Sequence, residues 1–106
     1  MPKKVELEIE KEKNKKIHPT AIVSKKAEIV ENVEIGPYSI INDDVIIDSG
    51  TKIHSHVLVE SGTRIGKNCQ IYQGAILGGE PQDLKFEGEK TYLKIGDNTL
   101  IREYAT

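Results

Sequence analysis

Aromatic residues and cysteine are scarce in this sequence. Its 106 residues include one phenylalanine, four tyrosines, no tryptophan and a single cysteine. One thiol excludes an internal disulfide and fits a reducing compartment, so we expect a cytoplasmic protein. The shortage of rings also means that aliphatic side chains must fill the interior.

A charge excess of one sign and long apolar runs are also missing. Lysine and arginine total 15 against 17 aspartate and glutamate, a net charge of −2, which does not predict a basic surface for nucleic acid. Near the N-terminus, apolar residues alternate with charged ones. A signal peptide or a membrane span would instead need an unbroken apolar segment. We therefore expect one domain with no nucleic acid partner and no membrane insertion.

The most regular feature present is an aliphatic residue at every sixth position. Neither the period of about 3.6 of a helix nor the period of about 2 of a strand explains this spacing. The fourth residue after each of the first ten aliphatics is small or β-branched, and the third is often Asn, Asp or Gly, which tolerate positive φ. The unit thus reads as a short strand ending in a corner. The aliphatic positions are Ile17, Val23, Ile29, Ile35, Ile41, Ile47, Ile53, Val59, Ile65, Ile71 and Leu77.

Three such sides make a coil of 18 residues, which places Ile17, Ile35 and Ile53 directly above one another. This pattern predicts an all-β solenoid, a parallel β-helix of about four to five coils over residues 17–106. The rhythm fails at 79–90 and returns at Ile95, so the sequence predicts one looped-out insertion that preserves the phase. Insertions of this kind often carry function.

Residues 1–16 form a charged N-terminal extension in which Val5, Leu7 and Ile9 alternate with charged residues. Such alternation is typical of a strand with one apolar face. We hypothesise that residues 5–10 add a capping strand to the first coil, where charges would discourage end-to-end stacking. The alternative is a disordered, charged extension.

Four stretches, at 17–23, 27–41, 66–91 and 95–106, carry a closer resemblance. They resemble the N-terminal part of the hexapeptide-repeat family of UDP-N-acetylglucosamine O-acyltransferases, which act in lipid A synthesis. The resemblance implies a left-handed β-helix and a homotrimer. It also implies, for the full-length family, acyl carrier protein and UDP-N-acetylglucosamine as partners.

By this resemblance, Gln82, Asp83 and Lys85 in the insertion are the substrate-binding residues. Their chemistry fits, because a carboxylate and an amide bind sugar hydroxyls while an ammonium meets phosphate as a point charge. The alternative is a solvated loop that contacts no substrate.

The resemblance implies no catalytic residue within this chain. The family's general base is a histidine, and it belongs to coils that would follow Thr106. We therefore expect a truncated N-terminal β-helix that supplies scaffold and sugar-nucleotide loop and shows no acyl transfer alone. The alternative is a shortened or engineered solenoid with a structural or self-assembly role.

The remaining reactive side chains are interpreted as structural. His18 matches a structural position, while His54 and His56 are expected near a corner without a third ligand, so no metal site is predicted. Cys69 falls in the small-residue register and is expected to point inward. The glycines lie at coil corners, and no phosphate-binding loop or cofactor is predicted.

Overall fold

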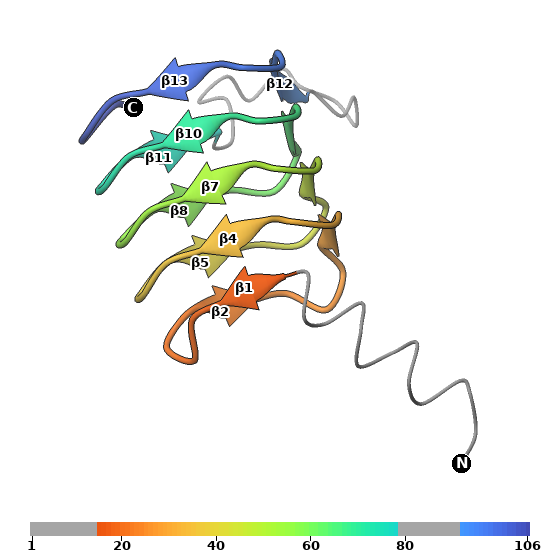
Figure 1. Ribbon diagram of the computed structural model, residues 1–106, viewed down its shortest axis with the longest axis vertical. Coiled ribbons are helices and arrows are strands. Elements are labelled where there is room, and N and C mark those ends of the chain that lie inside the picture. The colour runs from red at the N-terminus through yellow and green to blue at the C-terminus, as the bar shows by residue number, and fades with distance from the viewer. Residues whose placement is uncertain (1–14, 79–91) are drawn as a thin grey trace, which may run out of the picture.

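The computed structural model describes residues 15–78 and 92–106, and every regular element among them is a short β-strand (Figure 1). These strands are β1 (Lys16–Ile17), β2 (Ile22–Val23), β3 (Glu28–Ile29), β4 (Glu34–Ile35), β5 (Ile40–Ile41), β6 (Ile46–Ile47), β7 (Lys52–Ile53), β8 (Leu58–Val59), β9 (Thr63–Ile65), β10 (Gln70–Ile71), β11 (Ile76–Leu77), β12 (Leu93–Ile95) and β13 (Leu100–Ile101). No helix in this part of the chain is long and apolar enough to cross a membrane.

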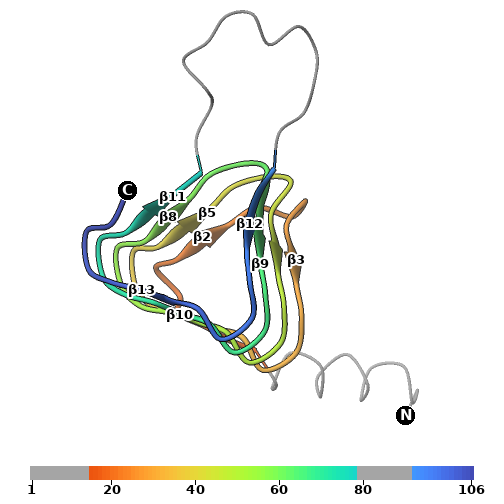
Figure 2. The same ribbon diagram turned by 90° about the horizontal axis from the view of Figure 1, so that it is seen from above.

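The strands form three parallel sheets that are the three sides of a prism. Sheet A is β1-β4-β7-β10-β13, sheet B is β11-β8-β5-β2, and sheet C is β12-β9-β6-β3. Seen from above, the chain runs clockwise through sheets A, B and C while rising toward the viewer, which makes the coil left-handed (Figure 2). The predicted left-handed parallel β-helix is confirmed.

The six-residue repeat sets the register between coils. Ile17 pairs with Ile35, Ile35 with Ile53, and Ile53 with Ile71, which is the predicted column. Backbone hydrogen bonds join successive coils, such as that from the Gly36 amide to the Ile53 carbonyl at 2.8 Å. Each coil is therefore held by the coils stacked directly before and after it along the prism.

The aliphatic side chains fill the prism, but the covered interior is shorter than the predicted four to five coils. Inward aliphatic residues from Val33 to Leu77 are at most 5% exposed, whereas Ile17 is 39% exposed and Ile101 is only partly buried. The described chain forms a solenoid of about three turns. Its end coils are less covered because, within the described residues, each has a neighbouring coil on one side only.

The small-residue register contributes hydrogen bonds as well as packing. Buried Ser39 donates from Oγ to the His54 carbonyl at 2.7 Å, and buried Thr51 donates from Oγ1 to the Gly66 carbonyl at 2.6 Å. Cys69 is buried as predicted, and its Sγ lies 3.1 Å from the Gly96 carbonyl oxygen. Its thiol thus occupies the place that the Thr51 hydroxyl takes one coil earlier.

The corners have the predicted positive φ at the Asn, Asp and Gly positions. These residues are Asn32, Asp44, Gly50, Gly62, Asn68 and Gly74. Tyr38, His56 and Tyr104 also have φ between 55° and 59°, which the sequence pattern did not predict. An L residue in this region is strained, and the inter-coil bond from the His56 amide to the Pro37 carbonyl at 3.0 Å helps to hold it.

The β-helix resumes in register after the predicted insertion. Leu93 pairs with Thr63, and Ile95 pairs with Ile65, so β12 stacks on β9 as if the chain had not been interrupted. The insertion at 79–90 and the proposed cap at 5–10 both lie outside the described residues.

Candidate functional site

The predicted substrate-binding residues Gln82, Asp83 and Lys85 lie outside the described part of the chain. The structure does define the two points where this segment joins the β-helix. They are Gly78, which follows β11, and Tyr92, which precedes β12, at the corner between sheets B and C (Figure 2).

The first attachment point requires a glycine. Gly78 has φ +85°, and a Cβ there would lie 2.5 Å from Thr63 Oγ1 and 3.4 Å from Glu60 Cβ. Thr63 is fully buried and donates from Oγ1 to the Glu60 carbonyl at 2.8 Å. Because Thr63 is fixed in this way, a side chain at position 78 has no room.

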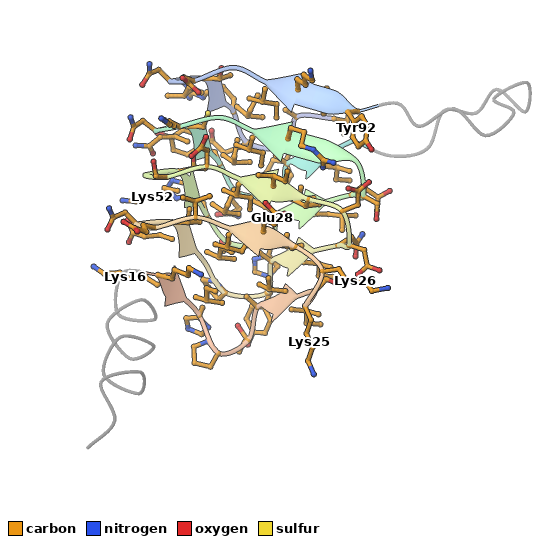
Figure 3. All side chains as sticks on the ribbon, turned by 90° about the vertical axis from the view of Figure 1, so that its right-hand side faces the viewer. Lys16, Lys25, Lys26, Glu28, Lys52 and Tyr92 are labelled. Carbon is orange, nitrogen blue, oxygen red and sulfur yellow. The ribbon has the colours of Figure 1, made fainter. Side chains whose placement is uncertain are left out.

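The second attachment point is a stack between Tyr92 and an arginine. Arg64 Cζ lies 4.3 Å from the centroid of the Tyr92 ring, within the range of a cation–π interaction. The next amide, that of Leu93, donates to the Gly62 carbonyl at 2.9 Å. Figure 3 shows Tyr92 at the edge of the sheet C face, where the chain enters β12.

The Arg64 guanidinium is held from its other side by Asp44. Nη2 lies 2.8 Å from Asp44 Oδ1, and Nη1 donates to the Asp44 carbonyl at 2.6 Å. The same carbonyl accepts the Gly62 amide at 2.9 Å. Asp44 occupies a corner at φ 57°, as predicted from the repeat. The same residue also holds the charged side chain of Arg64 in place.

The three histidines lie elsewhere, along sheet A and its corner with sheet B. His18 Nδ1 lies 2.9 Å from Thr20 Oγ1, the His54 ring stacks on Tyr72 at 4.6 Å, and the His56 ring lies 5.2 Å from Tyr38. Among the described residues, no three His, Cys, Asp or Glu side chains are grouped to hold a metal ion.

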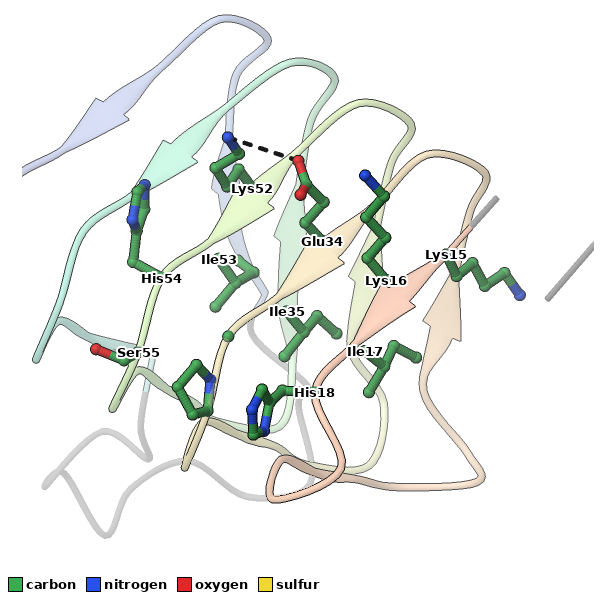
Figure 4. A pocket seen from close by; sticks show the side chains of 12 residues that line it. Lys15, Lys16, Ile17, His18, Glu34, Ile35, Lys52, Ile53, His54 and Ser55 are labelled. Atoms are coloured by element: carbon green, nitrogen blue, oxygen red, sulfur yellow. Dashed lines mark ion pairs between the residues drawn. The ribbon is translucent and has the colours of Figure 1, made fainter. Parts of the chain in front are cut away.

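Sheet A also carries a groove of about 680 Å³ that the sequence analysis did not predict (Figure 4). Its lining includes Lys15, Lys16, Glu34 and Lys52, and Lys52 Nζ lies 3.6 Å from the Glu34 carboxylate. Half-exposed ion pairs of this kind contribute little to stability. The groove is on the opposite side of the prism from Gly78 and Tyr92.

Among the described residues, one carboxyl has a shifted pKa, that of Glu103 at the corner after β13. A hydrogen bond from its own backbone amide lowers the pKa of Glu103, and the Arg102 guanidinium, with Nε 3.2 Å from the carboxylate, lowers it further. Glu103 is solvent-exposed at the corner between sheets A and B, away from the attachment points. It belongs to the surface and not to the candidate site.

The fold places the chain in the class of hexapeptide-repeat β-helix proteins, and the comparisons agree. The family described as "Bacterial transferase hexapeptide (six repeats)" matches residues 26–61. The acyl-(acyl-carrier-protein)–UDP-N-acetylglucosamine O-acyltransferase of Psychrobacter sp. (strain PRwf-1) is 58% identical over 87 residues, covering 82% of this chain and 34% of that protein. The same enzyme of Thermodesulfovibrio yellowstonii is 53% identical over 90 residues, covering 85% and 35%.

Solved structures give the same result. LpxA from Acinetobacter baumannii has a TM-score of 0.76 at 55% identity, covering 82% of this chain and 34% of that one. UDP-N-acetylglucosamine O-acyltransferase (LpxA) from Moraxella catarrhalis RH4 has a TM-score of 0.76 at 49% identity, covering 83% and 34%. The chain belongs to this acyltransferase family, as an N-terminal part, and spans about a third of the length of the relatives it matches.

Proposed function

We propose that residues 17–106 supply the β-helix scaffold and the sugar-nucleotide loop of an acyltransferase that transfers an acyl group from acyl carrier protein to UDP-N-acetylglucosamine. We call residues 79–90 the substrate loop. The observation that carries the proposal is that the β-helix is interrupted once and resumes in register at Leu93. The alignment with the relative from Thermodesulfovibrio yellowstonii extends over 90 residues, 85% of this chain, and any stretch of 90 residues in a chain of 106 includes residues 79–90.

The proposed binding residues are Gln82, Asp83 and Lys85. The Asp83 carboxylate and the Gln82 amide hydrogen-bond hydroxyls of the sugar nucleotide, and the Lys85 ammonium neutralises phosphate charge. A loop attached at two fixed points offers these groups with less freedom than an open chain end, which lowers the entropic cost of binding.

The test is binding of UDP-N-acetylglucosamine to this chain by isothermal titration calorimetry. Asp83→Asn removes one charge-assisted hydrogen bond, so we expect an affinity about tenfold lower than that of the unmodified chain. Glu31→Gln, an exposed carboxylate change at a distant corner, is the matched control and should leave the affinity unchanged. Equal affinity of the Asp83→Asn variant and the control would contradict the proposal.

We assign no catalytic residue, and we expect binding without acyl transfer from this chain. A general base must reach the hydroxyl that it deprotonates. His18, His54 and His56 lie on sheet A and its corner with sheet B, away from the attachment points of the substrate loop. Acyl transfer measured with purified chain and acyl carrier protein, and lost on substitution of any of these histidines, would overturn this assignment.

A parallel homotrimer completes the proposal, and sheet B offers the surface for it. The outward column of sheet B is entirely aliphatic, whereas those of sheets A and C include Lys16, Glu34, Glu28 and Lys94. Ile22, Ile40 and Ile76 are 65%, 38% and 42% exposed. A contiguous apolar surface of this kind marks an interaction site, and we assign it to two further copies of the chain. The column consists of Ile22, Ile40, Leu58 and Ile76.

The location of the protein and the alternative assembly are also proposed. We propose a cytoplasmic location, because the single thiol of Cys69 is buried and cannot form an internal disulfide. The self-assembly alternative predicts assemblies without a fixed size, whereas the sheet B surface predicts a closed one.

A further inference from the structure

We propose that the corner between sheets A and B is the second half of the interface between copies of this chain, and that it packs against the aliphatic column of sheet B in the next copy. Three residues along this corner, Tyr38, His56 and Tyr104, are called the aromatic corner. The inference rests on the proposed trimer, and it adds which edge of the prism lies nearest the threefold axis.

A closed trimer needs two different surfaces on each chain. Copies related by a threefold axis meet head to tail, and because their centres form an equilateral triangle, each copy meets its two neighbours in directions about 60° apart. In a three-sided prism, the middle of a face and the adjacent corner are also about 60° apart, so packing a corner against a face closes the ring. Sheet B ends at two corners, one shared with sheet A and one shared with sheet C (Figure 2).

Charge distinguishes these two corners. In the first two coils, the tips of the corner with sheet C are residues 25–26, both lysine, and residues 43–44, both aspartate. Moving such charges out of water into an interface is costly. In the described chain, the corner with sheet A has no Asp, Glu, Lys or Arg at its tips in the first four coils, which are residues 19–20, 37–38, 55–56 and 73–74. At the last tip, Glu103 is paired with Arg102 at 3.2 Å.

The backbone of the aromatic corner adopts a conformation that is unusual for such side chains. Tyr38, His56 and Tyr104 have φ of 59°, 55° and 57°, whereas the other two corners have Asn, Asp or Gly at positive φ. Positive φ is uncommon for a bulky residue, and strained residues of this kind cluster at functional sites. The rings are little buried within one chain, since Tyr38 and Tyr104 are 61% and 69% exposed. A neighbouring copy that covers them gives these side chains a role.

The aromatic side chains are already arranged along the corner. The centroids of the Tyr38 and His56 rings lie 5.2 Å apart. The Tyr104 ring lies over Gly74, where a Cβ would overlap it. Two residues after Tyr38, Ile40 in the aliphatic column of sheet B is 38% exposed. The apolar surface therefore continues from the corner onto sheet B, and aromatic residues are enriched in protein interfaces.

Three serines in successive corners provide matched positions for the test. Ser49, Ser55 and Ser61 are each the first tip residue of a corner, between sheets C and A, A and B, and B and C respectively. Each is replaced by cysteine, and each variant is treated with a bismaleimide, which joins two nearby thiols. The unmodified chain, whose Cys69 is buried, measures the background.

We expect the Ser55→Cys variant to form a linked species of twice the 11.8 kDa chain mass. It should form roughly a hundredfold faster than in Ser49→Cys or Ser61→Cys, the ratio of a millimolar effective concentration to a chain concentration of about 10 µM. Light scattering on the same samples reports whether the trimer is present. A trimer in which Ser55→Cys links no faster than the other two would overturn the inference and leave the proposed trimer standing. A monomeric unmodified chain would overturn both.

A second variant tests the aromatic side chain itself. Tyr38→Asn introduces a residue that tolerates φ of 59° better, so a role confined to the single chain predicts no loss of assembly. We expect its trimer to dissociate at a chain concentration about tenfold higher, because interface tyrosines are common hot spots. Lys26→Asn, the same change of residue at the corner with sheet C, is the control. Dissociation of both variants at the same concentration would show that the aromatic corner is not part of the interface.

Discussion

At some positions the addition of a single Cβ atom would prevent two coils from lying as close as they do. Gly36 shows this, because a Cβ there would lie 2.8 Å from the His54 carbonyl carbon and 3.0 Å from the Ser55 nitrogen. Both atoms belong to the backbone of the next coil and cannot rotate away. Gly96 stands at the same place in its own repeat, directly after an inward isoleucine, but its nearest neighbour would be Thr99 Oγ1 at 4.0 Å.

The pair provides a matched test of this close approach. Gly36→Ala forces two coils apart and should lower the free energy of unfolding by about 1–3 kcal/mol, as overpacking does. Gly96→Ala adds the same methyl group where space is open and should change stability little. Urea unfolding followed by circular dichroism measures both, and equal effects would show that inter-coil contact is not the cause.

Some features of individual residues could be predicted from the sequence, and others could not. Spacing alone identified Asp44 as a corner residue and Cys69 as an inward one, because both follow from the phase of the repeat. It did not identify the Arg64–Tyr92 stack, since Tyr92 lies next to a segment in which the phase is lost. It also missed the positive φ of Tyr38 and His56, since aromatic side chains are not typical of that conformation.

At the scale of the element, each strand is too short to be stable without the coils beside it. Strands of two or three residues gain their stability from stacking, which buries the inward side chain between neighbours. The column from Ile17 to Ile53 shows the gradient. Ile17 in β1 is 39% exposed, while Ile53 in β7 is 1% exposed.

Replacing isoleucine by alanine should therefore lower the free energy of unfolding by different amounts along this column. Ile53→Ala leaves a cavity between two coils and should destabilise the fold by about 2–5 kcal/mol. Ile17→Ala removes the same atoms from a partly exposed position and should cost about 1 kcal/mol or less by its smaller buried area. Chemical denaturation of the two variants checks the order, and an equal loss would mean that the first coil is covered by another part of the chain.

The elements were the most predictable level of the structure. The period of six located the inward residue of every strand, and the eighteen-residue coil gave the pairing of Ile35 with Ile53. The outward aliphatic column of sheet B had the same eighteen-residue spacing at Ile22, Ile40 and Ile76. It was overlooked because the inward repeat accounted for the periodicity by itself.

For the whole molecule, the surface of sheet B should determine the state of assembly. A trimer has three times the chain mass of 11.8 kDa, which light scattering after size exclusion can measure. Ile40→Glu places a charge in the middle of the aliphatic column, and burying an unpaired charge is costly, so we expect a monomer. Gln70→Glu introduces the same carboxylate on sheet A and should leave the trimer intact. Mass that rises with concentration without limit would instead favour the self-assembly alternative.

The return of the chain to register at Leu93 and Ile95 has a practical consequence. Because β12 lies on β9 with the spacing of every other coil, the core does not depend on how many residues separate Gly78 from Tyr92. We therefore expect the β-helix to form with peptides of other lengths and chemistries between these two residues, which would make the prism a display scaffold.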